Sequence, residues 1–189
     1  MTSGKRLNRS SRRTEEKKNA EPPESRKDKN RDKDVLVIDC MNLVSATVFA
    51  MPEMNTERDE TGVIYGFLRQ IRSLADRFKT SRFVFCWDSR DNYRKKVNPE
   101  YKANRAEMPE DLRPQIPLIR DLVAALSIPI VELQGYEADD VMATLAREAS
   151  AQGLKAVIVS PDKDLLQLVN DDAGITVLNT KEGEVWYDR

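Results

Sequence analysis

The amino-acid sequence predicts an α/β fold with a mostly parallel central sheet and helices on both of its faces. Short, continuous apolar runs, which are typical of strands buried on both faces, recur along the chain. Between them lie longer segments whose apolar residues recur at helical spacing, and this alternation is typical of a parallel α/β sheet. The chain has 189 residues, a length that fits one domain with an additional tail.

The first 34 residues differ in composition from the remainder. They hold 12 Lys and Arg against 7 Asp and Glu, and Leu7 is the one large apolar residue after the initiator Met. Such a segment buries too little surface to offset chain entropy, so we expect residues 1–34 to be a disordered basic tail. A solubilising role is favoured over contact with phosphates, because acidic residues are interspersed with the basic ones.

The first half of residues 35–189 contains two predicted strands and one predicted helix. Val35–Ile38 is an uninterrupted apolar run, which predicts a buried strand. From Thr61 to Phe78 apolar residues recur at helical spacing, so we expect an amphipathic helix there. Arg82–Trp87 is a second run of this kind and predicts a second buried strand.

The second half continues the alternation. Pro109 is expected to open an amphipathic helix that runs to Leu126, since proline suits a first helical turn. Further strands are expected at 129–133, 156–159, 175–178 and 184–187, and further helices at 137–151 and 162–169. No apolar run reaches the roughly 18–20 residues of a membrane-spanning helix, so we expect no membrane partner.

Acidic residues follow four of the predicted strands. Asp39 follows the first strand and Asp88 the second. The others follow the strands at 129–133 and 156–159, and they are Glu137, Asp139, Asp140, Asp162 and Asp164. In doubly wound sheets, ligands bind beyond the carboxyl ends of the strands. We therefore expect all seven carboxylates to meet at one edge of the sheet.

The number of these acids predicts a divalent-metal centre. A single acid at such a position is an ordinary helix cap or turn residue. Several anions at one edge repel one another and weaken a fold unless a cation is present. Ligation by oxygen alone favours Mg²⁺ or Mn²⁺, and we expect two ions. Histidine is absent and only two cysteines are present, which excludes histidine-based hydrolases and zinc knuckles.

A basic segment lies between the second strand and the second helix. This basic segment, residues 89–108, includes Arg90, Tyr93, Arg94, Lys95, Lys96, Tyr101, Lys102 and Arg105. Cations that meet the backbone and rings that stack on bases suit a single-stranded nucleic acid. A solvated loop is the alternative. Binding is favoured because the segment directly follows Asp88 and would project over the acidic edge.

Five sequence motifs occur in an order that matches a known family. They are VLVIDCMNLV, FVFCWDS, YRKKVNPEYKANR, GYEADDVMATLA and VSPDKDLLQLV. In these motifs the chain resembles the N-terminal, PIN-like (resolvase-like) catalytic domain of the 5′-to-3′ exonuclease and flap endonuclease superfamily. It is most similar to the 5′ nuclease domain of bacterial DNA polymerase I. The resemblance implies a PIN-like fold and one catalytic domain over residues 35–189, with the basic segment as an inserted arch or clamp.

The resemblance also implies roles for individual residues. A first metal ion would be held by Asp39, Asp88, Glu137 and Asp139 with Asp140 shared or close by, and a second or shared ion by Asp162 and Asp164. The arch would admit a 5′ single strand. The products of hydrolysis would be 5′-phosphorylated mono- or oligonucleotides. In the family a helical region with a helix–hairpin–helix-like element follows. This sequence stops at Arg189 without that region, so we expect weaker duplex binding or a protein partner in its place.

The sequence therefore predicts a divalent-metal-dependent 5′-3′ exonuclease or structure-specific 5′ nuclease that hydrolyses DNA by a two-metal mechanism. Its expected substrate is DNA with a 5′ single-stranded end or flap, and its expected location is the cytoplasm. Two alternatives stay open: a catalytically idle nucleic-acid-binding module, and a PIN-type ribonuclease that acts on RNA. The basic segment and the extra acids at Asp162 and Asp164 weigh against the ribonuclease.

Overall fold

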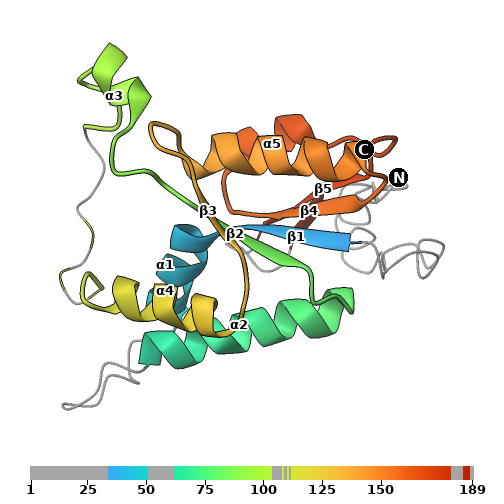
Figure 1. Ribbon diagram of the computed structural model, residues 1–189, viewed down its shortest axis with the longest axis horizontal. Coiled ribbons are helices and arrows are strands. Elements are labelled where there is room, and N and C mark those ends of the chain that lie inside the picture. The colour runs from blue at the N-terminus through green and yellow to red at the C-terminus, as the bar shows by residue number, and fades with distance from the viewer. Residues whose placement is uncertain are drawn as a thin grey trace, which may run out of the picture. The chain divides into compact units, whose positions relative to one another are not determined.

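The computed structural model describes residues 34–50, 62–103, 108, 110, 112–179 and 185–187. These residues form a central sheet with helices on both faces (Figure 1), and they belong to one unit that extends over residues 31–189. The expected basic tail lies outside the described residues, except that Asp34 is the first residue of the first strand. Within the described part, none of the helices combines the length and apolarity needed to cross a bilayer.

The described strands form one sheet in the order β3-β2-β1-β4-β5-β6. Their bounds are β1 Asp34–Asp39, β2 Phe83–Trp87, β3 Ile130–Glu132, β4 Lys155–Val159, β5 Ile175–Asn179 and β6 Val185–Tyr187. The first five are mutually parallel, and β6 pairs antiparallel with β5. The predicted fold class is confirmed. The chain order reverses between β1 and β4, which is the topological switch point where such sheets bind ligands.

Alternate strand residues supply two hydrophobic cores, one on each face of the sheet. On β1, Leu36 and Ile38 belong to the first core and Val37 to the second, because successive side chains point to opposite faces. The first core lies under helices α1 Cys40–Ala50, α2 Gly62–Phe78 and α4 Gln115–Ala125, and the second under α5 Ala138–Ala151 and the 3₁₀ helix η3 Lys163–Leu168 (Figure 1). The sheet is therefore packed against helices on both faces.

Helix α1 was not among the predicted elements. It begins directly after β1, where the Asp39 carboxylate accepts the backbone N–H of Asn42 at 3.0 Å and also the Asn42 side-chain amide. An Asp that binds the N–H three residues later is a helix N-cap. The same aspartate therefore ends β1 and starts α1, which fixes its carboxylate at the strand edge.

Two other predictions differ from the structure. Helix α4 starts at Gln115 and not at Pro109, because Arg113 precedes a proline and such a residue disfavours helical backbone. Residues 112–114 form a turn instead, closed by a bond from the Gln115 N–H to the Leu112 carbonyl at 3.1 Å. The helix predicted over 162–169 is the six-residue 3₁₀ helix η3, which Asp162 caps.

The first core predicts a large stability effect at Phe67. Its ring is fully buried with its centroid 5.6 Å from that of Phe85, so Phe67→Ala should lower the free energy of unfolding by about 3–5 kcal/mol. Tyr65→Ala, on the same helix but at a half-exposed side chain, should change it by no more than about 0.5 kcal/mol. Urea denaturation followed by circular dichroism measures both, and equal losses would contradict this assignment of the core.

Candidate metal centre

The carboxyl ends of four adjacent strands carry the predicted acids. Asp39 is the last residue of β1, and Asp88 directly follows β2. Glu137 is the N-cap of α5, which follows β3, and Asp139 and Asp140 lie in the first turn of that helix. Asp162, after β4, caps η3. Because β3, β2, β1 and β4 are neighbours in the sheet, the topology brings acids that are distant in sequence to the same edge.

Asp139 lies at the centre of one group of these acids. Its partial burial, followed by the negative charges of Asp39, Asp162 and Asp88, raises the pKa of Asp139 to about 7. Within the described part of the chain, no hydrogen bond to the Asp139 carboxylate is present to offset this. Four carboxylates from four different strand ends are thus close enough to repel one another.

The other three members of this group also have structural bonds. Asp39 caps α1 through Asn42, and Asp88 Oδ1 accepts the N–H of Ala138 at 2.8 Å, in the first turn of α5. Asp162 Oδ1 accepts the N–H of Asp164 at 2.9 Å. These bonds stabilise local turns and hold the carboxylates in place. They do not remove the charge that accumulates around Asp139.

The residues present fit a hard divalent cation in kind and in charge. The available donors are carboxylate oxygens, which such cations prefer, and the raised pKa of Asp139 reports negative charge that a cation would neutralise. Burial, followed by the charges of Asp39 and Asp139, raises the pKa of Cys86 to about 12, so this thiol stays protonated and is not a ligand. Among the described residues, no group of three or more Asp, Glu or Cys side chains is arranged so that it could hold a metal ion without rearrangement.

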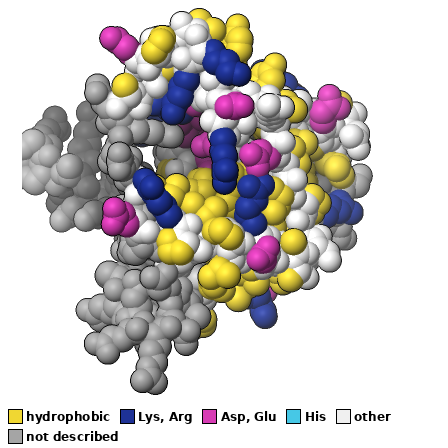
Figure 2. All heavy atoms as spheres, turned by 60° about the vertical axis from the view of Figure 1, so that its left-hand side comes forward, with side chains coloured by type: hydrophobic (Ala, Val, Ile, Leu, Met, Phe, Trp, Pro, Cys, Tyr) yellow, Lys and Arg dark blue, Asp and Glu magenta, His cyan; other side chains and the backbone are white. Residues whose placement is uncertain are grey.

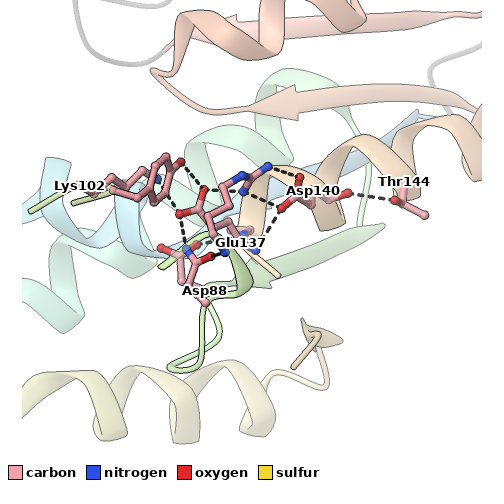
Figure 3. Close-up of polar contacts among 9 residues, drawn as sticks. Asp88, Lys102, Glu137, Asp140 and Thr144 are labelled. Carbon is pink, nitrogen blue, oxygen red and sulfur yellow. Dashed lines mark hydrogen bonds and ion pairs between the residues drawn. The ribbon is translucent and has the colours of Figure 1, made fainter. Parts of the chain in front are cut away.

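Glu137 and Asp140 belong to a second group, which is bound by the basic segment (Figure 3). Glu137 Oε1 accepts from Asn92 Nδ2 at 2.5 Å and Lys102 Nζ at 2.9 Å. Glu137 Oε2 accepts from Arg94 Nη1 at 2.8 Å and the Tyr101 hydroxyl at 3.1 Å. These donors come from two separate parts of the basic segment, residues 92–94 and 101–102, so the buried Glu137 carboxylate holds both parts together.

Arg94 also binds Asp140 with both terminal nitrogens, at 2.7 and 2.8 Å. The hydrogen bond to Asp140 is the main cause of a raised pKa for Arg94, which therefore stays charged. Burial alone would raise the pKa of Glu137, but the hydrogen bond and charge of Lys102, with bonds from Asn92 and Tyr101, bring it below its ordinary value. The second group is consequently neutralised by the protein itself.

Several other described residues of the basic segment face solvent, whereas Met108 at its end packs against the first core. Arg90, Tyr93, Lys95 and Lys96 are exposed, as is Asp164 on the acidic side, and Arg105 lies outside the described residues. Figure 2 shows Lys and Arg side chains beside Asp and Glu side chains on the face that the left-hand side of Figure 1 presents. Exposed cations next to an acidic edge suit a polyanion that must approach bound cations.

The site also contains a residue that the sequence analysis did not single out. Asn92 caps the five-residue helix α3 Tyr93–Val97 by accepting the N–H of Arg94, while its side-chain amide donates to Glu137. An Asn before a short helical run is a recognisable capping signal. Its second bond, to a residue 45 positions away, has no local sequence signal.

The charge around Asp139 predicts a pH-dependent effect of its removal. Below its ordinary value of 3.8, Asp139 is protonated in both the folded and the unfolded state. Between 3.8 and about 7 only the folded state binds this proton, so the free energy of unfolding falls as pH rises through this window. Without added metal, Asp139→Asn should therefore have a higher melting temperature than the wild type at about pH 8. The increase should be about 2–4 °C for each kcal/mol of repulsion that the substitution removes.

The advantage of the Asn variant should shrink as the pH falls toward about 4. Glu148→Gln removes an exposed carboxylate from the same helix and should shift the melting temperature little at either pH. Differential scanning fluorimetry over this pH range makes the comparison. A difference between Asp139→Asn and wild type that does not vary with pH would contradict the charge crowding described above.

Comparison with known proteins identifies the family of the chain. Residues 34–189 match the family model described as "5′-3′ exonuclease, N-terminal resolvase-like domain". A 5′-3′ exonuclease of Aquifex aeolicus (strain VF5) is 39% identical over 156 residues, which are 82% of this chain and 53% of that protein. DNA polymerase I of Caldicellulosiruptor bescii is 36% identical over 149 residues, 78% of this chain and 18% of the polymerase. The chain thus spans about half the length of the first relative and less of the second.

Solved structures share the fold at low sequence identity. The T5 D15 protein co-crystallised with metal ions aligns with a TM-score of 0.58 and 18% identity, over 82% of this chain and 57% of its own. The T5 5′-exonuclease with bound divalent zinc aligns with a TM-score of 0.59 and 18% identity, over 82% and 58% of the two chains. The match over residues 34–189 decides the assignment: the chain belongs to the family of 5′-3′ exonuclease N-terminal, resolvase-like domains.

Proposed function

We propose that this chain is the catalytic domain of a divalent-metal-dependent 5′ nuclease that hydrolyses phosphodiester bonds of DNA. The observation that carries the proposal is the crowding of Asp39, Asp88 and Asp162 around Asp139, which raises the pKa of Asp139 to about 7. Carboxylates whose pKa values are strongly shifted concentrate at functional sites, so this repulsion supports a catalytic role for the edge. Family membership and the metal ions in the T5 proteins support the same proposal.

Hydrolysis at such a centre relies on divalent cations, here Mg²⁺ or Mn²⁺ and two in number, to activate water and to neutralise phosphate charge. Asp39, Asp88, Asp139 and Asp162 would hold these cations, because each follows a different strand and the four strands are neighbours in the sheet. A water oxygen would attack the phosphorus and the P–O3′ bond would break. The 5′ fragment would then leave with a 3′-hydroxyl that takes one proton of the water, the other proton would go to solvent, and the remaining strand would begin with a 5′-phosphate.

The basic segment would position the DNA. Lys95 and Lys96 are exposed on α3, beside the acidic edge, where they can bind backbone phosphates and place the scissile one over the acids. The exposed Tyr93 ring and the Tyr101 ring offer surfaces on which bases of a 5′ single strand can stack. DNA with a 5′ end or flap is therefore the substrate that we propose, and RNA is the comparison substrate.

One observation favours a catalytically idle nucleic-acid-binding module instead. Arg94 and Lys102 already neutralise Glu137 and Asp140, so part of the acidic edge is satisfied without metal. Such a module would bind DNA in a salt-sensitive manner and leave it intact. Measurement of DNA cleavage therefore distinguishes the nuclease from the idle module.

The nuclease proposal predicts that Asp139→Asn strongly slows cleavage. With Mn²⁺ and a 5′-labelled flap DNA, the wild-type chain should release labelled product. Asp139→Asn should be slower by about 10²-fold or more, the scale of losing one electrostatic group at a reacting centre. Denaturing gel electrophoresis measures the product. Glu148→Gln, which removes an exposed carboxylate from the same helix, should cleave at the wild-type rate.

Two outcomes decide against a DNA nuclease. If the flap DNA stays intact with excess protein and Mn²⁺ while gel-shift assays show binding, the idle module is the correct function. If a matched RNA flap is cleaved and the DNA flap is not, the protein is a ribonuclease.

A further inference from the structure

Three carboxylates within the same helical turn have different electrostatic environments. Glu137 and Asp140 are paired with cations of the basic segment. Asp139, between them in sequence, is surrounded by Asp39, Asp162 and Asp88, and among its main electrostatic neighbours only Lys102 lowers its pKa. The first turn of α5 is therefore divided between a neutralised side and a repulsive side.

Glu137 has no acceptor capacity left. An ionised carboxylate offers about four lone-pair sites, and the Glu137 oxygens accept hydrogen bonds from Asn92, Lys102, Arg94 and Tyr101. Any cation that binds a Glu137 oxygen must therefore displace at least one residue of the basic segment.

Asp140 is nearly saturated in the same way. Its Oδ2 accepts both Arg94 Nη1 at 2.8 Å and the backbone N–H of Glu137 at 3.2 Å, and its Oδ1 accepts Arg94 Nη2 at 2.7 Å. Arg94 thus occupies oxygens of both carboxylates at once. A guanidinium fork of this kind fits a carboxylate in a way that no single ammonium group can reproduce.

The same contacts hold the basic segment in place. Helix α3 has five residues and none of them is buried, so hydrophobic packing contributes little to its position. Its tethers include the Arg94 fork, the bond from its N-cap Asn92 to Glu137, and a backbone bond from the Tyr93 N–H to the Gly135 carbonyl at 2.8 Å. Lys102 reaches Glu137 from a left-handed backbone conformation with φ of 57°, which a non-glycine residue adopts at a cost.

We infer that Arg94 is a resident counter-ion that competes with divalent cations for Glu137 and Asp140, so that cation binding at the acidic edge loosens the basic segment. The inference rests on the proposed function, because it takes the edge to be a divalent-cation site. Linkage makes the competition reciprocal: whatever weakens the hold of Arg94 must strengthen cation binding. Arg94 is therefore a positioning residue whose release frees the basic segment to receive DNA.

Calorimetric titration of Mn²⁺ without DNA tests the competition. Arg94→Gln removes the fork and the charge, whereas Arg94→Lys keeps the charge and loses the fork. Both variants should bind Mn²⁺ more tightly than wild type, with Arg94→Gln tighter by about three- to tenfold and Arg94→Lys in between. Arg147→Gln removes an exposed charge from α5 and should stay within about twofold of wild type.

Arg94→Lys separates competition from simple charge repulsion. If it binds Mn²⁺ like the wild type while Arg94→Gln binds more tightly, charge alone explains the effect and the inference is wrong. Unchanged or weaker binding by both variants also overturns it, and leaves Arg94 as a structural anchor. If wild-type protein binds no Mn²⁺ and neither variant gains binding, the proposed function fails as well.

Hydrogen exchange gives a second readout that a purely structural role would not change. Saturating Mg²⁺ should speed exchange in wild-type peptides that cover residues 93–102, because the cation displaces Arg94, while peptides from β1 and β4 stay protected. In Arg94→Gln that segment should already exchange fast without Mg²⁺ and change little on addition. Equal exchange of wild-type residues 93–102 with and without Mg²⁺ would overturn the inference.

Discussion

Mutual repulsion among carboxylates at one sheet edge is the constraint on which the rest of the structure depends. Asp139 meets the charges of Asp39, Asp88 and Asp162, and with its burial these raise its pKa to about 7. Burial of apolar side chains in two cores, one on each face of the sheet, offsets the unfavourable free energy of this repulsion. The repulsion follows from the parallel topology, because the carboxyl ends of neighbouring strands, and the acids that follow them, lie at the same edge of the sheet.

The protein neutralises only part of this charge with its own side chains. Glu137 and Asp140 receive Arg94 and Lys102 from the basic segment, whose short helix α3 has no buried residue. Around Asp139, burial and the charges of Asp39, Asp162 and Asp88 outweigh the opposing charge of Lys102, so the pKa of Asp139 stays raised. This division places the charge around Asp139 next to a basic segment that ion pairs hold at the same edge of the sheet.

Local pattern was enough to predict the sheet and most of the edge. The apolar run at Val35–Ile38 lies in β1, as predicted, and Asp39 is the last residue of that strand. Helix α1 was missed because its start depends on a cap that Asp39 itself provides. The pairing of Arg94 with Asp140, which are 46 positions apart, has no local signal, since side-chain contacts between distant segments exist only in the folded chain.

Direct location of the cation tests the central claim. A crystal grown with Mn²⁺ and measured at a wavelength that excites manganese should give an anomalous peak among Asp39, Asp88, Asp139 and Asp162, about 2.0–2.2 Å from carboxylate oxygens, near the distances of hard-cation sites. Contacts between that peak and three or more of the four side chains would support the account. Fully ordered carboxylates with no peak among them, at a Mn²⁺ concentration that labels other surface acids, would contradict it.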